Sequence, residues 1–356
     1  MAEALTTPTD PAGLSAALPA AEQALWVAVT GAPGPAQRRA VAKSITLLES
    51  TRPDHRVRAD ALLNALLPAS GRSFRLGISG VPGVGKSTFI EALGLKLIDQ
   101  GHRVAVLAVD PSSSLSGGSI LGDKTRMERL SMDERAYIRP SPASGTLGGV
   151  AEKTREAMLV CEAAGHDVVI VETVGVGQSE IAVAGMTDMF VLLQLPNAGD
   201  DLQAIKKGVM ELADLVVINK ADLGEAAATR ARAQISSSLR LIASTGARGH
   251  ADHPHQGHTD WQPQVMQLSA LKGSGLPDFW AAVSQFRASQ TANGRLAARR
   301  HRQDQAWMDS LIGAGLSQRF KAHPAVRAAL PALTDAVRSG AVAPSVAARR
   351  LLDLFH

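Results

Sequence analysis

The segment from Gly80 to Ser87 constrains the fold of this chain more than any other. It reads GVPGVGKS and fits the pattern G-x-x-x-x-G-K-[ST] at every fixed position. A predicted buried strand, Phe74–Ser79, precedes it, and a predicted amphipathic helix from Thr88 to about Asp99 follows it. Glycines in such a loop let backbone N–H groups converge on phosphate oxygens beside the positive end of the helix. The context therefore predicts a phosphate-binding loop rather than an ordinary glycine-rich turn.

Two side chains of this loop have expected roles. We expect Lys86 to place its charge near the β- and γ-phosphates of a nucleotide, and we expect the Ser87 hydroxyl to bind Mg²⁺. The residues predicted to contact the nucleotide here are Gly80, Val81, Pro82, Gly83, Val84, Gly85, Lys86, Ser87 and Thr88.

Short apolar runs recur along the central part of the chain and alternate with helical patterns. Runs that are apolar throughout are typical of strands buried on both faces, and the alternation indicates parallel βαβ units. The sequence thus predicts an α/β fold, a three-layer P-loop NTPase domain with a mainly parallel sheet. The predicted strands are Phe74–Ser79, Val104–Val109, Tyr137–Arg139, Val168–Val171, Met189–Leu195, Leu215–Ile218 and Val265–Leu268.

Ala- and Leu-rich helical sequence flanks the α/β region on both sides. Residues 1–70 predict an N-terminal helical extension, interrupted at Pro33 and Pro53, and residues 71–287 form the predicted nucleotide-binding domain. Residues 288–356 predict a C-terminal helical extension. Extensions this small do not easily form cores of their own, so we expect them to pack on the α/β domain or on another copy of it.

The composition excludes several classes of protein. The 37 basic and 33 acidic residues are too evenly balanced to indicate a nucleic-acid-binding protein. The single cysteine, Cys161, excludes a disulfide framework and a zinc ribbon. No run approaches the roughly 18 consecutive apolar residues of a membrane span, and the N-terminus does not resemble a secretory signal. We expect a cytoplasmic protein with neither nucleic acid nor membrane as partner.

The segment NKAD at residues 219–222 follows the apolar run Leu215–Ile218 and predicts the base. The Asp222 carboxylate can accept hydrogen bonds from the N1 and N2 donors of guanine, a donor pair that adenine lacks. The stem of Lys220 can cover the base, and we expect Asn219 to hold neighbouring loops together. The pattern favours GTP over ATP. A second contact, from backbone N–H to guanine O6, is expected from Ser269, Ala270 and Leu271.

Acidic residues near strand ends and in Gly/Ser-rich loops are candidates for metal binding and catalysis. Open α/β sheets bind their ligands at the carboxyl ends of the strands, and Mg²⁺ prefers oxygen ligands. Glu172 occupies the place of the Asp in D-x-x-G, with Gly175 as the glycine. We favour a catalytic role for Glu172, orienting the attacking water, and holding a magnesium-bound water is the alternative. The candidate metal ligands are Ser87, Asp110, Asp123 and Glu172.

A charged segment after Leu195, reading PNAGDDLQAIKK, predicts a switch that moves with the nucleotide state. Its candidate functional residues are Asp200 and Lys206. The alternative for Asp200 is plain N-capping of a helix.

Together these motifs resemble the MeaB/ArgK/MMAA family of P-loop GTPases, which are G-protein chaperones of adenosylcobalamin-dependent acyl-CoA mutases. The resemblance is dense over residues 75–225 and weaker on both flanks. It is carried by GISGVPGVGKST, VDPSSSLSGGSILGDKTRM, IRPSPASGTLGGVAEKTRE, VETVGVGQSE, NAGDDLQAIKKG and NKAD.

The resemblance implies more than the residues alone. It implies a GTPase domain over 71–287 that binds GTP or GDP with Mg²⁺, and a homodimer formed through a C-terminal dimerisation arm. It also implies an acyl-CoA mutase partner, acting on methylmalonyl-, isobutyryl-, 2-hydroxyisobutyryl- or ethylmalonyl-CoA. The chain would gate cobalamin loading and protect or reactivate that mutase, with an adenosyltransferase as a further partner. The family's functional residues carry over to Lys86, Asp110, Asp123, Glu172 and, in the switch Asn197–Lys207, to Asp200 and Lys206.

Two other functions compete with this interpretation. A metallochaperone GTPase delivering nickel or zinc is suggested by residues 249–260, which hold four histidines, although no cysteine accompanies them and we expect a solvated surface loop instead. The second competing function is that of a small-molecule kinase that uses the phosphate-binding loop. The run VETVGVGQSE favours the mutase chaperone over metal delivery, and N-K-x-D disfavours the kinase. The histidines concerned are His250, His253, His255 and His258.

Overall fold

The computed structural model describes residues 18–109, 127–140, 147–173, 179–196, 207–244 and 261–355. The chain divides into two compact units, Met1–Ala297 and Ala298–His356. The sequence-predicted residues Asp110, Asp123, Asp200 and Lys206, and the four-histidine segment, lie outside the described residues.

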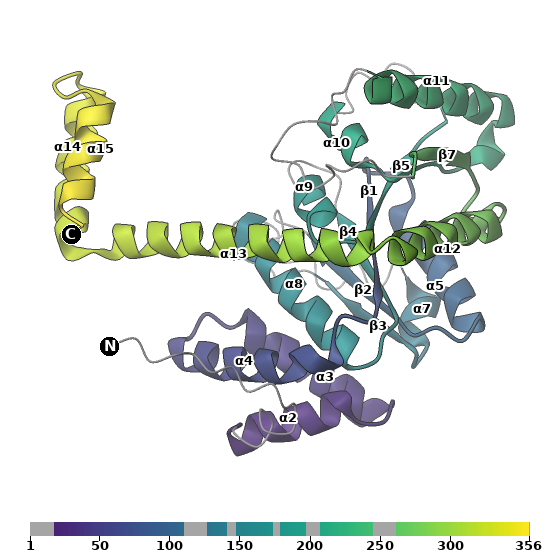
Figure 1. Ribbon diagram of the computed structural model, residues 1–356, viewed down its shortest axis with the longest axis horizontal. Coiled ribbons are helices and arrows are strands. Elements are labelled where there is room, and N and C mark those ends of the chain that lie inside the picture. The colour runs from purple at the N-terminus through teal and green to yellow at the C-terminus, as the bar shows by residue number, and fades with distance from the viewer. Residues whose placement is uncertain are drawn as a thin grey trace. The chain divides into compact units, whose positions relative to one another are not determined.

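A seven-stranded sheet forms the centre of the first unit, in the order β3-β2-β4-β1-β5-β6-β7 (Figure 1). Every pairing between neighbouring strands is parallel. This confirms the predicted three-layer P-loop fold with its mainly parallel sheet. The strands are β1 Phe74–Gly80, β2 Val104–Val109, β3 Ala136–Arg139, β4 Val168–Thr173, β5 Met189–Gln194, β6 Leu215–Ile218 and β7 Gln264–Gln267.

Helices cover both faces of this sheet, and alternate strand residues enter two separate cores. Leu76 and Ile78 of β1 enter the core that holds Phe89 and Phe279, whose rings meet edge-on at 5.0 Å. The other core is formed with the N-terminal helices and those after β3. The helices of the α/β region are α5 Lys86–Asp99, α7 Glu128–Met132, α8 Leu147–Ala163, α9 Ser179–Ala184, α10 Lys207–Leu212, α11 Glu225–Ser244 and α12 Leu276–Ala292, with 3-10 turns η1 Leu67–Ala69 and η4 Ala221–Leu223.

Three N-terminal helices, α2 (Ala20–Thr30), α3 (Pro35–Glu49) and α4 (Pro53–Leu66), form a layer against α8 (Figure 1). The first residues of α3 and α4 are prolines, which suit a helix start because the missing N–H has no helical partner there. The buried Gln37 side chain donates to the Val29 carbonyl at 2.8 Å and to the Ala164 carbonyl at 3.0 Å. It therefore fixes α3 to both α2 and the end of α8.

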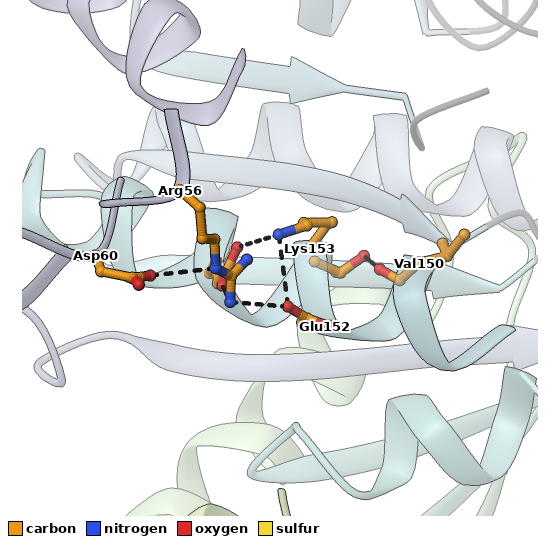
Figure 2. Close-up of polar contacts among 7 residues, drawn as sticks. Arg56, Asp60, Val150, Glu152 and Lys153 are labelled. Atoms are coloured by element: carbon orange, nitrogen blue, oxygen red, sulfur yellow. Dashed lines mark hydrogen bonds and ion pairs between the residues drawn. The ribbon is translucent and has the colours of Figure 1, made fainter. Parts of the chain in front are cut away.

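Charged side chains join α4 to α8 (Figure 2). The Arg56 guanidinium lies 3.1 Å from Glu152 and 3.5 Å from Glu156, and it also pairs with Asp60 of its own helix at 3.3 Å. Lys153 approaches Glu156 at 3.1 Å. Glu156 is only 3% exposed, and burial raises the pKa of its carboxyl group, against the opposing pull of Lys153 and Arg56. A buried carboxylate thus depends on a cation supplied by the N-terminal layer.

Arg56→Met is expected to lower the free energy of unfolding by about 1–2 kcal/mol, because it leaves Glu156 with one cation instead of two. Glu156→Gln should be neutral or stabilising at neutral pH. The pKa of Glu156 is higher in the folded protein than in the unfolded chain. The free energy of unfolding therefore decreases as the pH rises through these two pKa values and this carboxyl group becomes charged. Urea unfolding followed by circular dichroism measures both. Arg52→Met, which removes an exposed pair with Asp54, is the control and should change nothing measurable. Equal losses in Arg56→Met and Arg52→Met would contradict this account.

Helices joined by short turns make up the described residues of the second unit, 298–355. It contains most of α13 (Arg295–Ala322), together with α14 (Pro324–Arg338) and α15 (Pro344–Asp353). The Phe355 ring meets Phe320 edge-on at 5.5 Å. Along α13 three large apolar side chains, Met308, Ile312 and Leu316, recur once per turn and are each more than half exposed. They form an uncovered apolar stripe on this helix.

In the described part of the chain, no helix is both long and apolar enough to cross a membrane.

Candidate nucleotide-binding site

The loop between β1 and α5 has the backbone that its glycines predict. Gly83 and Gly85 have φ angles of +79° and +94°, in the left-handed region that favours glycine. A Cβ on Gly85 would also lie 2.8 Å from the amide nitrogen of Asn219. Glycine at 83 and 85 therefore allows the backbone of this turn, and at Gly85 the missing side chain also allows the close approach of Asn219.

Lys86, the first residue of α5, turns its buried side chain back into the loop. Its ammonium group donates to the Gly80 carbonyl at 2.7 Å and approaches the Val81 carbonyl at 3.3 Å. Ser87 follows in the first turn of the helix and is half-buried. The loop therefore contains a fixed positive charge and a hydroxyl group next to the N-terminus of α5.

Asn219, at the end of β6, joins three loops. Its buried side-chain amide donates to the Val84 carbonyl at 2.9 Å, and its side-chain oxygen accepts a hydrogen bond from the Ala270 N–H at 3.0 Å. The next residue, Lys220, has a φ of +59° and donates from its ammonium group to the Gly83 carbonyl at 2.8 Å. The phosphate-binding loop is thus connected directly to the segments after β6 and β7, as the sequence predicted for Asn219.

Asp222 carries the carboxylate expected to read the base. A hydrogen bond from the Ser269 hydroxyl holds the pKa of Asp222 below its usual range, helped by the charges of Lys272 and Lys220. The Lys272 ammonium lies 3.8 Å from an Asp222 oxygen. Ser269 is itself held, because its N–H donates to the Ser274 carbonyl at 3.0 Å. At neutral pH Asp222 is therefore ionised and acts only as a hydrogen-bond acceptor.

Glu172 lies inside β4 rather than after it, because the strand continues to Thr173. In the parallel register it is opposite Ile78 of β1 on one side and Ala108 of β2 on the other. Its side chain is 8% exposed. Thr173 beside it donates to the Ser79 hydroxyl at 2.8 Å. This places a buried carboxyl group two strand residues before the phosphate-binding loop of the neighbouring strand.

The described site residues therefore lie together at the carboxyl ends of the parallel strands. The phosphate-binding loop and Glu172 follow or end the central strands β1 and β4, while residues 219–222 and 269–271 follow β6 and β7. Two contributions to this site were not expected from the sequence. Lys272 pairs with Asp222, and only its position just after the predicted backbone contact could have indicated it. The Ser269 side chain supports Asp222, whereas only backbone contact was expected from it.

The oxygen donors available here fit Mg²⁺. Ser87 offers a hydroxyl and Glu172 a carboxyl group, both hard ligands, and Mg²⁺ commonly completes its shell with water and phosphate oxygens. Among the described residues there is no cluster of three or more His, Cys, Asp or Glu side chains that could hold a metal ion. The described donors thus suit a metal shared with a phosphate ligand.

A parallel sheet, a phosphate-binding loop, and an N-K-x-D segment that contacts this loop through Asn219 and carries an ionised Asp222 define a P-loop GTPase. Residues 41–325 match the profile of the family described as "Methylmalonyl Co-A mutase-associated GTPase MeaB". The chain belongs to this family, which confirms the resemblance inferred from its motifs. It is accordingly an enzyme that hydrolyses GTP.

Named relatives support this assignment. A "Putative GTPase" of Caulobacter vibrioides is 54% identical over 89% of this chain and 94% of its own length. The "Methylmalonic aciduria type A homolog, mitochondrial" of Mus musculus is 47% identical over 90% of this chain and 77% of its own length. A crystal structure of a LAO/AO transport system kinase aligns with a TM-score of 0.71 and 35% identity, covering 98% of this chain and 99% of that one.

Proposed function

We propose that this GTPase is a chaperone for an adenosylcobalamin-dependent acyl-CoA mutase, with methylmalonyl-CoA mutase as the first client to test. In this proposal it binds GTP or GDP with Mg²⁺ and uses hydrolysis to gate loading of the cobalamin cofactor and to protect or reactivate the mutase. The observation that carries the proposal is the Asn219 connection between base loop and phosphate loop, in a chain whose family is described as mutase-associated.

Each described residue has a distinct part in the proposed nucleotide complex. Asp222 accepts from the N1 and N2 donors of guanine, and the Leu271 N–H faces O6, since the Ala270 N–H already donates to the Asn219 side-chain oxygen. Lys86 transfers its hydrogen bonds from the Gly80 carbonyl to the β- and γ-phosphates. Asn219 keeps the two binding regions at a fixed separation, so that base recognition and phosphate positioning occur together.

Ser87 would hold the magnesium ion, with Glu172 as a further ligand directly or through water. The ion would neutralise charge on the β- and γ-phosphate oxygens. Asp110 and Asp123 remain proposed ligands, and Asp200 and Lys206 remain proposed residues of a switch that responds to the γ-phosphate. Each of these four can be tested by the same substitution assays as Glu172.

Glu172→Gln is expected to keep nucleotide binding within about threefold while lowering the single-turnover rate of GTP hydrolysis by about 100-fold or more, because a general base typically contributes that factor. Phosphate release and fluorescent-nucleotide titration measure the two quantities. Glu128→Gln, an exposed carboxyl group on α7, is the matched control. A hydrolysis rate equal to that of the unchanged protein would remove Glu172 from the proposed mechanism.

The client can be identified by measuring Mg²⁺-dependent GTP hydrolysis alone and with purified acyl-CoA mutases of different substrate classes. Slow basal turnover that rises sharply with one mutase would support the chaperone proposal and name the client. A rate of GTP hydrolysis that no mutase changes but that nickel or zinc does change would favour metal delivery instead. An adenosyltransferase can be added to the same assay as a proposed further partner.

We further propose a homodimer assembled through the C-terminal helices, with residues 1–70, 71–287 and 288–356 as helical extension, GTPase domain and dimerisation arm. The uncovered stripe of Met308, Ile312 and Leu316 on α13 supports this, since exposed apolar rows of this kind mark interaction sites. Sedimentation of the full chain, with Ile312→Asp as the disrupting variant, tests the dimer. A cytoplasmic location belongs to the same proposal.

A further inference from the structure

A groove runs between helices α2 and α3, on the N-terminal layer and outside the nucleotide site. It encloses about 430 Å³. Its floor is almost entirely methyl groups, and two basic side chains border it. The lining residues are Ala21, Ala24, Leu25, Ala28, Ala36 and Ala40, with Arg39 and Lys43 at the rim.

The rim carries uncompensated positive charge. Arg39 and Lys43 lie one turn apart on α3, both are exposed, and among the described residues neither forms an ion pair. The acid of α2, Glu22, cannot neutralise them, because it is buried and held by Arg58 of α4 at 2.6 Å. The groove is therefore apolar at its floor and positive along one side.

The groove is also rigidly mounted. Gln37 of α3 donates to the carbonyls of Val29 and Gly31, at 2.8 and 3.0 Å, which fixes the turn between the two helices. Its third contact, with the Ala164 carbonyl, ties that turn to the α/β core. A preformed groove loses little conformational entropy on binding.

We propose that this α2–α3 groove receives an amphipathic helix of a partner protein, whose apolar ridge lies on the alanines and whose acidic residues pair with Arg39 and Lys43. Small side chains let a third helix approach closely, and an apolar ridge in an apolar groove is a common mode of helix recognition. Acidic side chains one turn apart on that helix match the spacing of the two cations. The inference rests on the proposed function, which makes the acyl-CoA mutase the partner.

The test uses the full chain with a GTP analogue and purified methylmalonyl-CoA mutase as the probe, measuring the dissociation constant at low and high salt. Arg39→Glu with Lys43→Glu is expected to weaken binding about tenfold or more and to flatten its salt dependence. Ala24→Trp, which fills the groove from an exposed position, should weaken binding by a similar factor at every salt concentration. Basal GTP hydrolysis should not change in either variant.

Matched control variants make the same changes of charge and size outside the groove, so that an effect specific to the groove can be recognised. Arg230→Glu with Arg232→Glu reverses two exposed charges on α11, and Val57→Trp adds bulk at an exposed site of α4, so both should bind the mutase normally. Thermal unfolding verifies that all variants are folded.

The outcomes are distinguishable. If the unchanged chain binds the mutase and the groove variants bind equally well, the groove proposal is overturned while the proposed function stands. If the unchanged chain binds no mutase, the proposed function fails and the groove proposal fails with it. If the Arg39 and Lys43 reversal instead changes the sedimentation of the chain alone, the groove joins copies of this chain, which would also overturn the proposal.

Discussion

Replacing Lys86 with alanine is expected to weaken GTP binding by about 100-fold or more, and with it to abolish hydrolysis at ordinary GTP concentrations. The ammonium group is buried in the loop, where it donates to the Gly80 and Val81 carbonyls. In the nucleotide complex these bonds pass to phosphate oxygens and become charge-assisted. Two such bonds contribute roughly 1.5–3 kcal/mol each, which corresponds to that loss of affinity.

The control for Lys86→Ala is Lys96→Ala on the same helix, which removes a half-exposed lysine far along α5. Titration with a fluorescent GTP analogue measures affinity, and thermal unfolding without nucleotide shows whether the loop variant folds. Binding by a folded Lys86→Ala protein within a few-fold of the unchanged protein would contradict the placement of the phosphates at this loop.

The positions of the strands along the chain were predictable because burial leaves a continuous apolar run, whereas their order in the sheet was not predicted. Strand ends were less predictable where the last residues are polar. β4 was expected to end at Val171 but continues through Glu172 to Thr173, because the ladder with β1 and β2 extends past the apolar run. Hydrophobic patterning reports which side chains are buried, whereas a strand ends where its hydrogen bonds end. The predicted strand Val168–Val171 was therefore two residues too short, and Glu172 lies inside the observed strand.

The parts of the site that could be predicted are those formed by motifs of consecutive residues. GVPGVGKS and NKAD each specify a local geometry. The phosphate-binding loop, and the contacts of Asn219 with neighbouring loops, could therefore be predicted from the sequence. The left-handed backbone of Lys220 and the support of Asp222 by Ser269 depend on the folded arrangement of separate loops. The Arg56–Glu152 pair joins residues 96 apart in the chain. No periodicity marks such a pair, because its partners meet only once both helices have docked.

Asp222→Asn is expected to reverse the base preference, weakening GTP by about 100-fold and admitting xanthosine triphosphate. The Ser269 hydrogen bond and the nearby lysines keep the pKa of Asp222 low, so the unchanged side chain is an acceptor for two guanine donors. Asparagine presents one acceptor and one donor. That pattern clashes with the guanine N2 amino group but matches the N1–H and the C2 carbonyl of xanthine.

Competition binding with GTP and xanthosine triphosphate measures the reversal, and Asp278→Asn, an exposed acid in the first turn of α12, serves as the control. Asn219 provides the complementary test, since it holds the loops without reading the base. Asn219→Ala should weaken both nucleotides together, because it breaks the contacts with Val84 and Ala270 that position base and phosphates at once. Only a specificity change confined to Asp222→Asn assigns recognition of the base to that carboxylate; an unchanged preference would place the base elsewhere.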